Sequence, residues 1–77
     1  MAYQGATDMT YYTIVTLDNG KWSPQWGTFD KKEAQEERAT MFTDYRRADV
    51  KIIATDDNQA AINAGVAALN TQYKANI

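Results

Sequence analysis

Carboxylates are the side chains of this chain whose types and spacing come closest to those needed for acid–base catalysis, because the usual catalytic side chains are missing. The sequence has no histidine and no cysteine, and Ser23 is its single serine, which rules out a histidine general base and a nucleophilic triad. An acid and a base would have to come from Glu33, Glu36, Glu37, Asp56 and Asp57. We interpret the aspartates as helix caps and the glutamates as a solvated face near a helix N-terminus. We therefore predict that the protein is not an enzyme and uses no cofactor.

Metal binding, disulfides and membrane insertion are also not expected. The segment Asp56-Asp57-Asn58 lacks the alternating ligands and the glycine of a calcium-binding loop. The absence of cysteine removes thiolate ligands and disulfides, and it fits a reducing cytoplasm. No apolar run approaches membrane-spanning length, and residues 1–10 lack the basic and apolar regions of a signal peptide. We therefore expect a cytoplasmic protein that does not contact a membrane.

Three basic residues that lie close together in the sequence are the candidates for contact with nucleic acid: Arg46, Arg47 and Lys51. Aromatic residues on a sheet could stack bases beside them. The charge balance opposes this interpretation, since eight basic and ten acidic residues give a net charge of −2, without the positive excess typical of such binders. Nucleic-acid binding is therefore the alternative hypothesis, behind binding to another protein or to a second copy of the chain.

The chain's two tryptophans flank its one proline, in the segment Trp22-Ser23-Pro24-Gln25-Trp26. Tryptophan is enriched at the energetic centres of protein interfaces. Pro24 has no N–H for a hydrogen-bond ladder, which predicts that this segment is an edge strand. The predicted partner-binding residues are Tyr11, Tyr12, Trp22 and Trp26.

The elements that must position these residues begin with a hairpin. Residues 1–10 show no periodicity and are expected to form a flexible leader, followed by a single domain over 11–77. β-Branched and aromatic residues over 11–17 predict a first strand, and a second strand is expected over 21–29. The dipeptide Asn19-Gly20 is typical of the turn between such strands.

Two registers of this hairpin remain open. A two-residue turn would place Leu17 opposite Trp22 and Thr13 opposite Trp26. A three-residue turn with a bulge at Gly20 would shift the register by one and move the tryptophans beside Ile14 and Tyr12.

A helix, a third strand and a second helix follow. The segment Asp30-Lys31-Lys32-Glu33 fits a capping box and predicts a helix from Lys31 to about Tyr45. The segment 50–55 predicts a strand. Gly65 lies in the apolar stripe of the last helix, which suggests a close approach to the sheet or to the first helix. The core face of that last helix is formed by Ile62, Val66, Leu69 and Tyr73.

These elements define an α+β fold with the order ββαβα. We predict a three-stranded antiparallel sheet in the order 2-1-3, because Pro24 places the second strand at an edge and the third strand can pair with the free side of the first. Both helices are expected on one face of the sheet. The other face would then be open and would carry the aromatic residues.

Two short-range resemblances involve the passage from the second strand into the first helix. Gly20-Lys21-Trp22 and Trp26-Gly27-Thr28-Phe29-Asp30 resemble plant AP2-type DNA-binding domains, and the same passage is similar to the repeat of peptidoglycan-binding SPOR domains. In the AP2 family, arginines and tryptophans on a three-stranded sheet contact the major groove of DNA, and the strands here carry no arginine. Physically, we expect Phe29 to pack under the helix and Asp30 to cap it.

A broader resemblance covers most of the chain, from Tyr12 to Asn70. The segments 12–15, 20–27, 51–55 and 59–64 resemble small uncharacterised proteins of tailed bacteriophages. This resemblance implies an accessory protein in the cytoplasm of an infected bacterium, one that binds or inhibits a host protein. We therefore expect a small non-enzymatic protein-interaction module, acting on a protein partner or as a homodimer.

Overall fold

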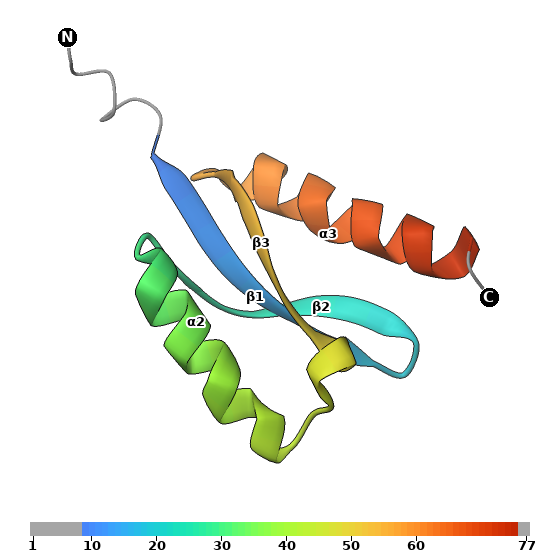
Figure 1. Ribbon diagram of the computed structural model, residues 1–77. Helices are drawn as coiled ribbons and strands as arrows, with labels where there is room; N and C mark the ends of the chain where they lie inside the picture. Colours follow the sequence, from blue (N-terminus) through green and yellow to red (C-terminus); the bar gives the residue numbers. More distant parts are fainter. Residues whose placement is uncertain (1–8, 76–77) are drawn as a thin grey trace, which may run out of the picture.

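The computed structural model describes residues 9–75 and contains one sheet and two α-helices (Figure 1). The strands pair in the order β2-β1-β3, antiparallel throughout, which confirms the predicted α+β fold and strand order. The expected leader falls mostly on residues 1–8, which lie outside the described residues, and Thr10 already belongs to the first strand. The elements are β1 (Thr10–Asp18), β2 (Lys21–Thr28), α2 (Lys31–Thr40), β3 (Val50–Asp56) and α3 (Gln59–Ala75), with short 3-10 turns at Met41–Thr43 and Arg47–Asp49.

The β1–β2 connection is a two-residue turn. Asn19 and Gly20 have φ angles of 54° and 78°, and Asp18 pairs with Lys21 on either side of them. Positive φ at both central positions defines a type I′ turn, which asparagine and glycine tolerate best. The first of the two predicted registers is therefore correct next to the turn.

A bulge at Gln25 changes the register farther along β2. Val15 lies opposite Pro24, whereas Ile14 lies opposite Trp26, so no residue of β1 lies directly opposite Gln25. The Gln25 side-chain amide donates to Thr16 Oγ1 at 3.0 Å, which holds the extra residue in place. The predicted pairing of Thr13 with Trp26 is wrong, because one unpaired residue reverses the alternation of side chains beyond it.

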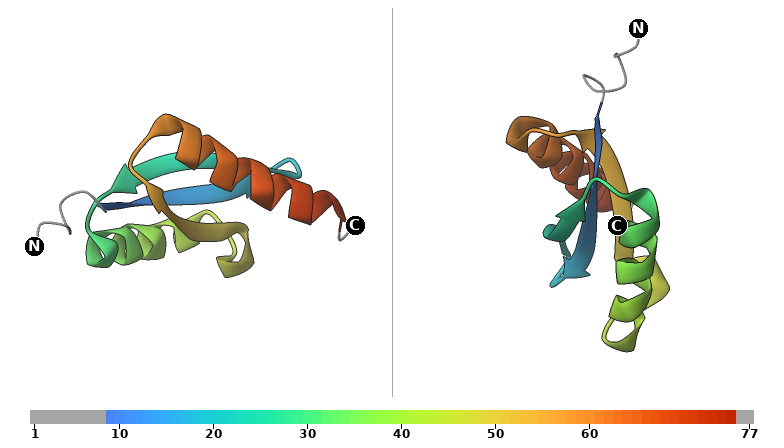
Figure 2. Two further views of the ribbon diagram at one scale, coloured as in Figure 1. Left: turned by 90° about the horizontal axis from the view of Figure 1, so that it is seen from above. Right: turned by 90° about the vertical axis from the view of Figure 1, so that its left-hand side faces the viewer.

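The two helices cover opposite faces of the sheet, which corrects the prediction that both lie on one face. Figure 2 shows α2 and α3 on the two sides of β1. The burial of β1 agrees, since the four consecutive residues from Thr13 to Thr16 are all buried. Successive side chains of a strand point to opposite faces, so both faces of β1 must be covered. The prediction failed because it left the apolar residues on both faces of β1 unexplained.

The helix α2 starts at the predicted cap. The Asp30 carboxylate accepts hydrogen bonds from the main-chain N–H groups of Lys32 and Glu33, at 3.0 and 3.4 Å. Glu33 reaches back through Thr28, whose hydroxyl donates to Glu33 at 2.6 Å and accepts from the Asp30 N–H at 3.1 Å. Phe29 does not pack under the helix as predicted: it is 50% exposed, and its ring forms a T-shaped contact with the Tyr11 ring.

The helix α2 also ends before the predicted position near Tyr45. The α-helical bonds stop at Thr40, where a 3-10 turn over Met41–Thr43 takes over. The Thr40 hydroxyl donates to the Glu37 carbonyl at 2.7 Å. Threonine side chains compete in this way with the helical hydrogen bonds of the main chain, which explains the early end.

The helix α3 approaches the sheet at Gly65, as predicted. A Cβ atom on Gly65 would lie 3.0 Å from Ile53 Cδ1 and 3.3 Å from Thr55 Cγ2, so glycine allows this close contact. Asn58 caps the helix by accepting from the Ala61 N–H at 2.8 Å. Because Ile53 and Thr55 share one face of β3, α3 covers that face, and α2 covers the face that carries Ile14.

Candidate functional site: the edges of the sheet

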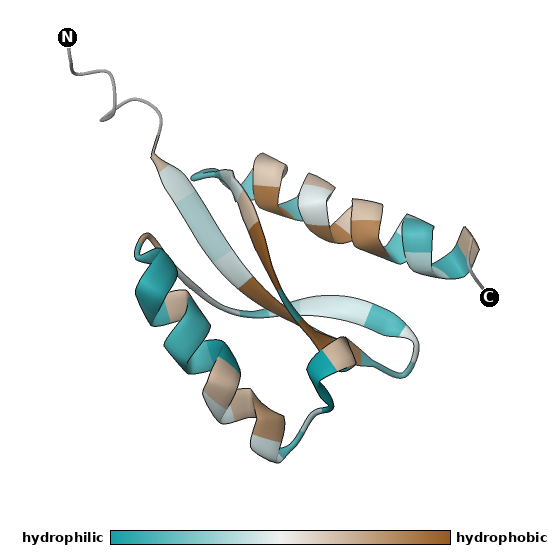
Figure 3. Ribbon diagram, viewed as in Figure 1, coloured by the Kyte–Doolittle hydropathy of each residue, from teal (hydrophilic) through white to brown (hydrophobic). Residues whose placement is uncertain are grey.

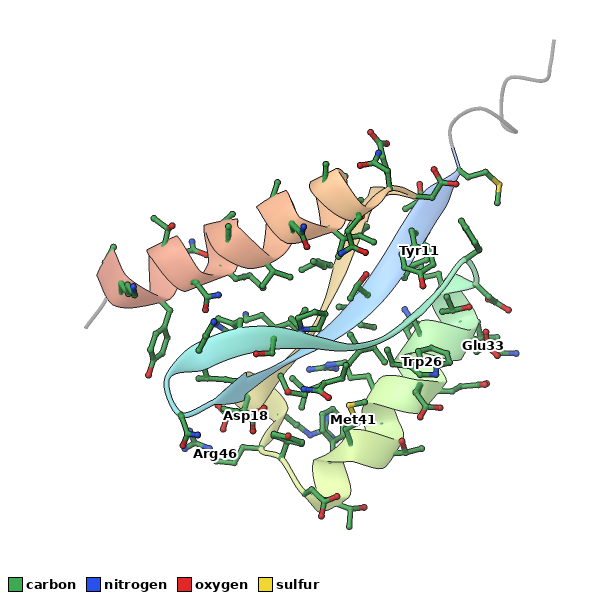
Figure 4. All side chains as sticks on the ribbon, turned by 180° about the vertical axis from the view of Figure 1, so that it is seen from behind. Tyr11, Asp18, Trp26, Glu33, Met41 and Arg46 are labelled. Atoms are coloured by element: carbon green, nitrogen blue, oxygen red, sulfur yellow. The ribbon has the colours of Figure 1, made fainter. Side chains whose placement is uncertain are left out.

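The structure does not bring the four predicted aromatic residues together. Trp22 lies opposite Leu17, on the face covered by α3, and is only 4% exposed. Trp26 lies opposite Ile14, on the α2 face, and Figure 4 shows it beside α2. Tyr11 and Tyr12, as neighbours on β1, point to opposite faces as well. The predicted open aromatic face does not exist, and Trp22 is a core residue.

The three predicted basic residues each have a different neighbour. Arg46 forms an ion pair with Asp49, at 3.1 Å between Nε and Oδ2, and this hydrogen bond raises the pKa of Arg46 above its ordinary value. The Arg47 guanidinium lies over the Phe42 ring at 4.6 Å. The Lys51 ammonium lies 5.7 Å from the centre of the Trp22 ring. All three are exposed near the start of β3.

The outer edge of β2 is closed to further pairing. Asn70 of α3 bonds to both polar main-chain atoms of Trp22: its oxygen accepts from the N–H at 2.6 Å, and its nitrogen donates to the carbonyl at 3.2 Å. Pro24 has no N–H, and the bulge at Gln25 interrupts the strand. Proteins protect exposed strand edges by such means.

The direction of the main-chain groups on β3 follows from the register. Asp18 and Lys21 flank a two-residue turn and so form a hydrogen-bonded pair. Alternate residues of β1 counted from Asp18 therefore bond to β2, and those between them bond to β3. The residues of β3 opposite that second set, Lys51, Ile53 and Thr55, bond inward to β1. The main-chain groups of Val50, Ile52, Ala54 and Asp56 consequently point away from the sheet.

The outward groups at the two ends of β3 have partners within the protein. Arg38 Nε donates to the Val50 carbonyl at 3.0 Å, which agrees with the outward direction deduced for Val50. The Asp56 carbonyl accepts from the Thr55 hydroxyl at 2.8 Å. Within residues 9–75, the outward N–H groups of Ile52 and Ala54 donate no hydrogen bond to a side chain or to another loop, and their C=O groups accept none.

The side chains around these free groups are apolar and accessible. Ile52 and Ile53 are half-buried and Ala54 is exposed, and Figure 3 shows the hydrophobic middle of β3. In Figure 1, β3 lies in front of β1, between the two helices. A depression of about 350 Å³ adjoins this edge and is lined by Gln35, Arg38, Lys51 and Ile52. The open part of β3 therefore offers main-chain groups and apolar side chains together.

Comparison of the chain with known protein families, with curated proteins and with solved structures finds no match. In the part of the chain that the structure describes, no helix has the length and apolar character needed to cross a membrane.

Proposed function

We propose that this protein is a small non-enzymatic interaction module that binds a protein segment by adding a strand to the edge of β3. In this mode of recognition, main-chain hydrogen bonds supply affinity and alternate side chains supply specificity. The proposal is carried by two residues at the centre of β3, Ile52 and Ala54. Each has an outward N–H and C=O group without a hydrogen-bond partner in the described part of the chain.

The contrast between the two edges supports this assignment. An unpaired edge is a liability, because any extended chain can pair with it. The β2 edge is protected by Asn70, Pro24 and the bulge, whereas β3 has neither a proline nor a bulge. Lys51, the one charged side chain within the central part of β3, leans toward Trp22. The open edge is thus confined to one strand, as expected for a binding site.

The origin and location of the protein belong to the same proposal. The resemblance to small tailed-phage proteins and the absence of cysteine support an accessory protein that acts in a bacterial cytoplasm on a host protein. Nothing in the geometry of the β3 edge requires a cofactor or a reactive side chain for such binding.

A library of short peptides tests strand addition directly, because it samples many extended segments at once. Peptides would be selected on the immobilised protein and then compared on two variants, Ala54→Pro and Ala54→Ser. Proline removes the outward N–H without touching a bond to β1, whereas serine keeps that N–H. We expect selected peptides that bind the parent and Ala54→Ser but not Ala54→Pro. The proposal would be wrong if no peptide or protein that binds the parent requires the Ala54 N–H for binding.

A further inference from the structure

We infer that a second copy of this chain occupies the β3 edge, with the two β3 strands antiparallel and the two sheets joined into one of six strands. This inference rests on the proposed function, since it names the partner that the open edge takes. It goes beyond that function by defining a symmetric homodimer with a particular arrangement of charges.

Charge complementarity is the main argument for a second copy. The start of β3 carries Arg47 and Lys51, and its end carries Asp56 and Asp57. Within residues 9–75, Arg46–Asp49 is the one ion pair, so these four charges have no ionic partner there. Antiparallel pairing about a twofold axis places the basic end of each strand beside the acidic end of the other. The strand is therefore electrostatically complementary to itself.

The directions of the main-chain groups define the register. A twofold axis at Ile53 sets Ile52 opposite Ala54 of the second copy, and both residues have outward N–H and C=O groups. They would thus form a hydrogen-bonded pair on each side of the axis. The two Ile53 side chains would face each other at the axis, on the α3 side of the sheet. Lys51 would lie diagonally across from Asp57 of the second copy, within the reach of a long side chain.

The small core gives a second argument. In the described part of the chain, only five apolar residues are fully or almost fully buried, namely Ile14, Val15, Trp22, Ala34 and Val50. Chains of this length bury a low fraction of their surface when they fold alone. Pairing of the β3 strands would cover the half-exposed side chains of Ile52 and Ile53 and would extend the core across the axis.

The first experiment measures mass in solution by sedimentation and by light scattering. We expect the parent and Ala54→Ser to be dimers, and Ala54→Pro to be a monomer whose far-ultraviolet circular dichroism matches that of the parent. A parent that stays monomeric up to about 1 mM, where mass action strongly favours association, would overturn the dimer. A dimer that persists in folded Ala54→Pro would also overturn it.

A charge exchange keeps the inference testable if Ala54→Pro does not fold. Lys51→Glu and Asp57→Lys should each weaken the dimer at low salt, because each variant places like charges together at both symmetric positions. A mixture of the two variants should form a heterodimer, in which both pairs again have opposite signs. If the mixture associates no better than each variant alone, the proposed register is wrong.

The two proposals fail in different ways. If the parent is a monomer and selected peptides still require the Ala54 N–H, the homodimer is excluded and strand addition stands. If neither dimer formation nor the binding of any peptide requires the Ala54 N–H, both proposals are excluded.

Discussion

Asn70 of α3 bonds to both polar main-chain atoms of Trp22 on β2, accepting from its N–H at 2.6 Å and donating to its carbonyl at 3.2 Å. One amide side chain therefore takes the place that a neighbouring strand would occupy. The same contact joins the second half of α3 to the sheet. Loss of Asn70 should consequently affect both the stability of the domain and the protection of the β2 edge.

Asn70→Ala should lower the free energy of unfolding by about 1–3 kcal/mol, because it leaves a part-buried N–H and carbonyl without partners. Chemical denaturation measures this change. Asn63→Ala is the matched control on α3, since Asn63 accepts from the Gln59 side chain at an exposed site, and its cost should stay within about 0.5 kcal/mol. Equal effects of the two substitutions would contradict the proposed role of Asn70.

Two buried threonines of β1 should respond oppositely to replacement by valine. Thr13 Oγ1 is buried without a hydrogen-bond partner, so Thr13→Val should leave stability unchanged or raise it by about 1 kcal/mol. Thr16 Oγ1 donates to Asp18 at 2.9 Å and accepts from Gln25 at 3.0 Å. Thr16→Val should therefore destabilise the domain by about 1–3 kcal/mol. Thermal unfolding of the pair is the measurement, and a costly Thr13→Val would show that its hydroxyl has a partner in solution.

The two tryptophans should differ strongly in their contribution to stability. Trp22 is 4% exposed beneath α3, whereas Trp26 is half-buried on the other face. Trp22→Ser should unfold the domain or cost about 3–5 kcal/mol, the range for removal of a large aromatic side chain from a core. Trp26→Ser should retain the fold at a smaller cost. Denaturation curves of the two variants decide this, and a folded, fully stable Trp22→Ser would place Trp22 outside the core.

Binding to random DNA or RNA should be undetectable at physiological salt. Non-specific affinity comes from neutralisation of phosphates by basic side chains, and here the net charge is −2 while Arg46 is paired with Asp49. A fluorescence anisotropy titration at several salt concentrations is the measurement. A micromolar affinity with a steep salt dependence would favour the nucleic-acid hypothesis over strand addition.

Local sequence signals predicted the elements of the fold and the strand order. Asn19-Gly20, Asp30 and Pro24 each determine one feature of the main chain nearby: a turn, a helix start and an edge strand. Gly65 likewise indicated a close contact with the sheet. Such residues act through their own φ angles, caps or missing groups, and for that reason they can be interpreted without the rest of the structure.

The arrangement of side chains on the faces was predicted less well, because it depends on long-range packing. The bulge at Gln25 has no distinctive residue type, and its bond to Thr16 forms only in the folded hairpin. The run of apolar residues in β1 did indicate a strand covered on both faces. The open edge of β3 also follows from the order 2-1-3, which makes β3 the second edge, but its free groups can be identified only from the register and from the positions of Arg38 and Asn70.

The bulge at Gln25 also changes which face of the sheet the side chains of β2 occupy on either side of it. In a regular strand, residues four apart lie on the same face, and Trp22 and Trp26 would then compete for space in one layer. The unpaired residue reverses the alternation of side chains along β2. The two tryptophans therefore lie on opposite faces, and each helix packs over one of them. Deletion of Gln25 would leave the two tryptophans three residues apart, so in a regular strand Trp26 would still lie opposite Ile14, on the face away from Trp22. A one-residue deletion at this exposed position should thus keep each tryptophan under its own helix and remove mainly the hydrogen bond from Gln25 to Thr16, whereas replacement of Gln25 would keep the bulge.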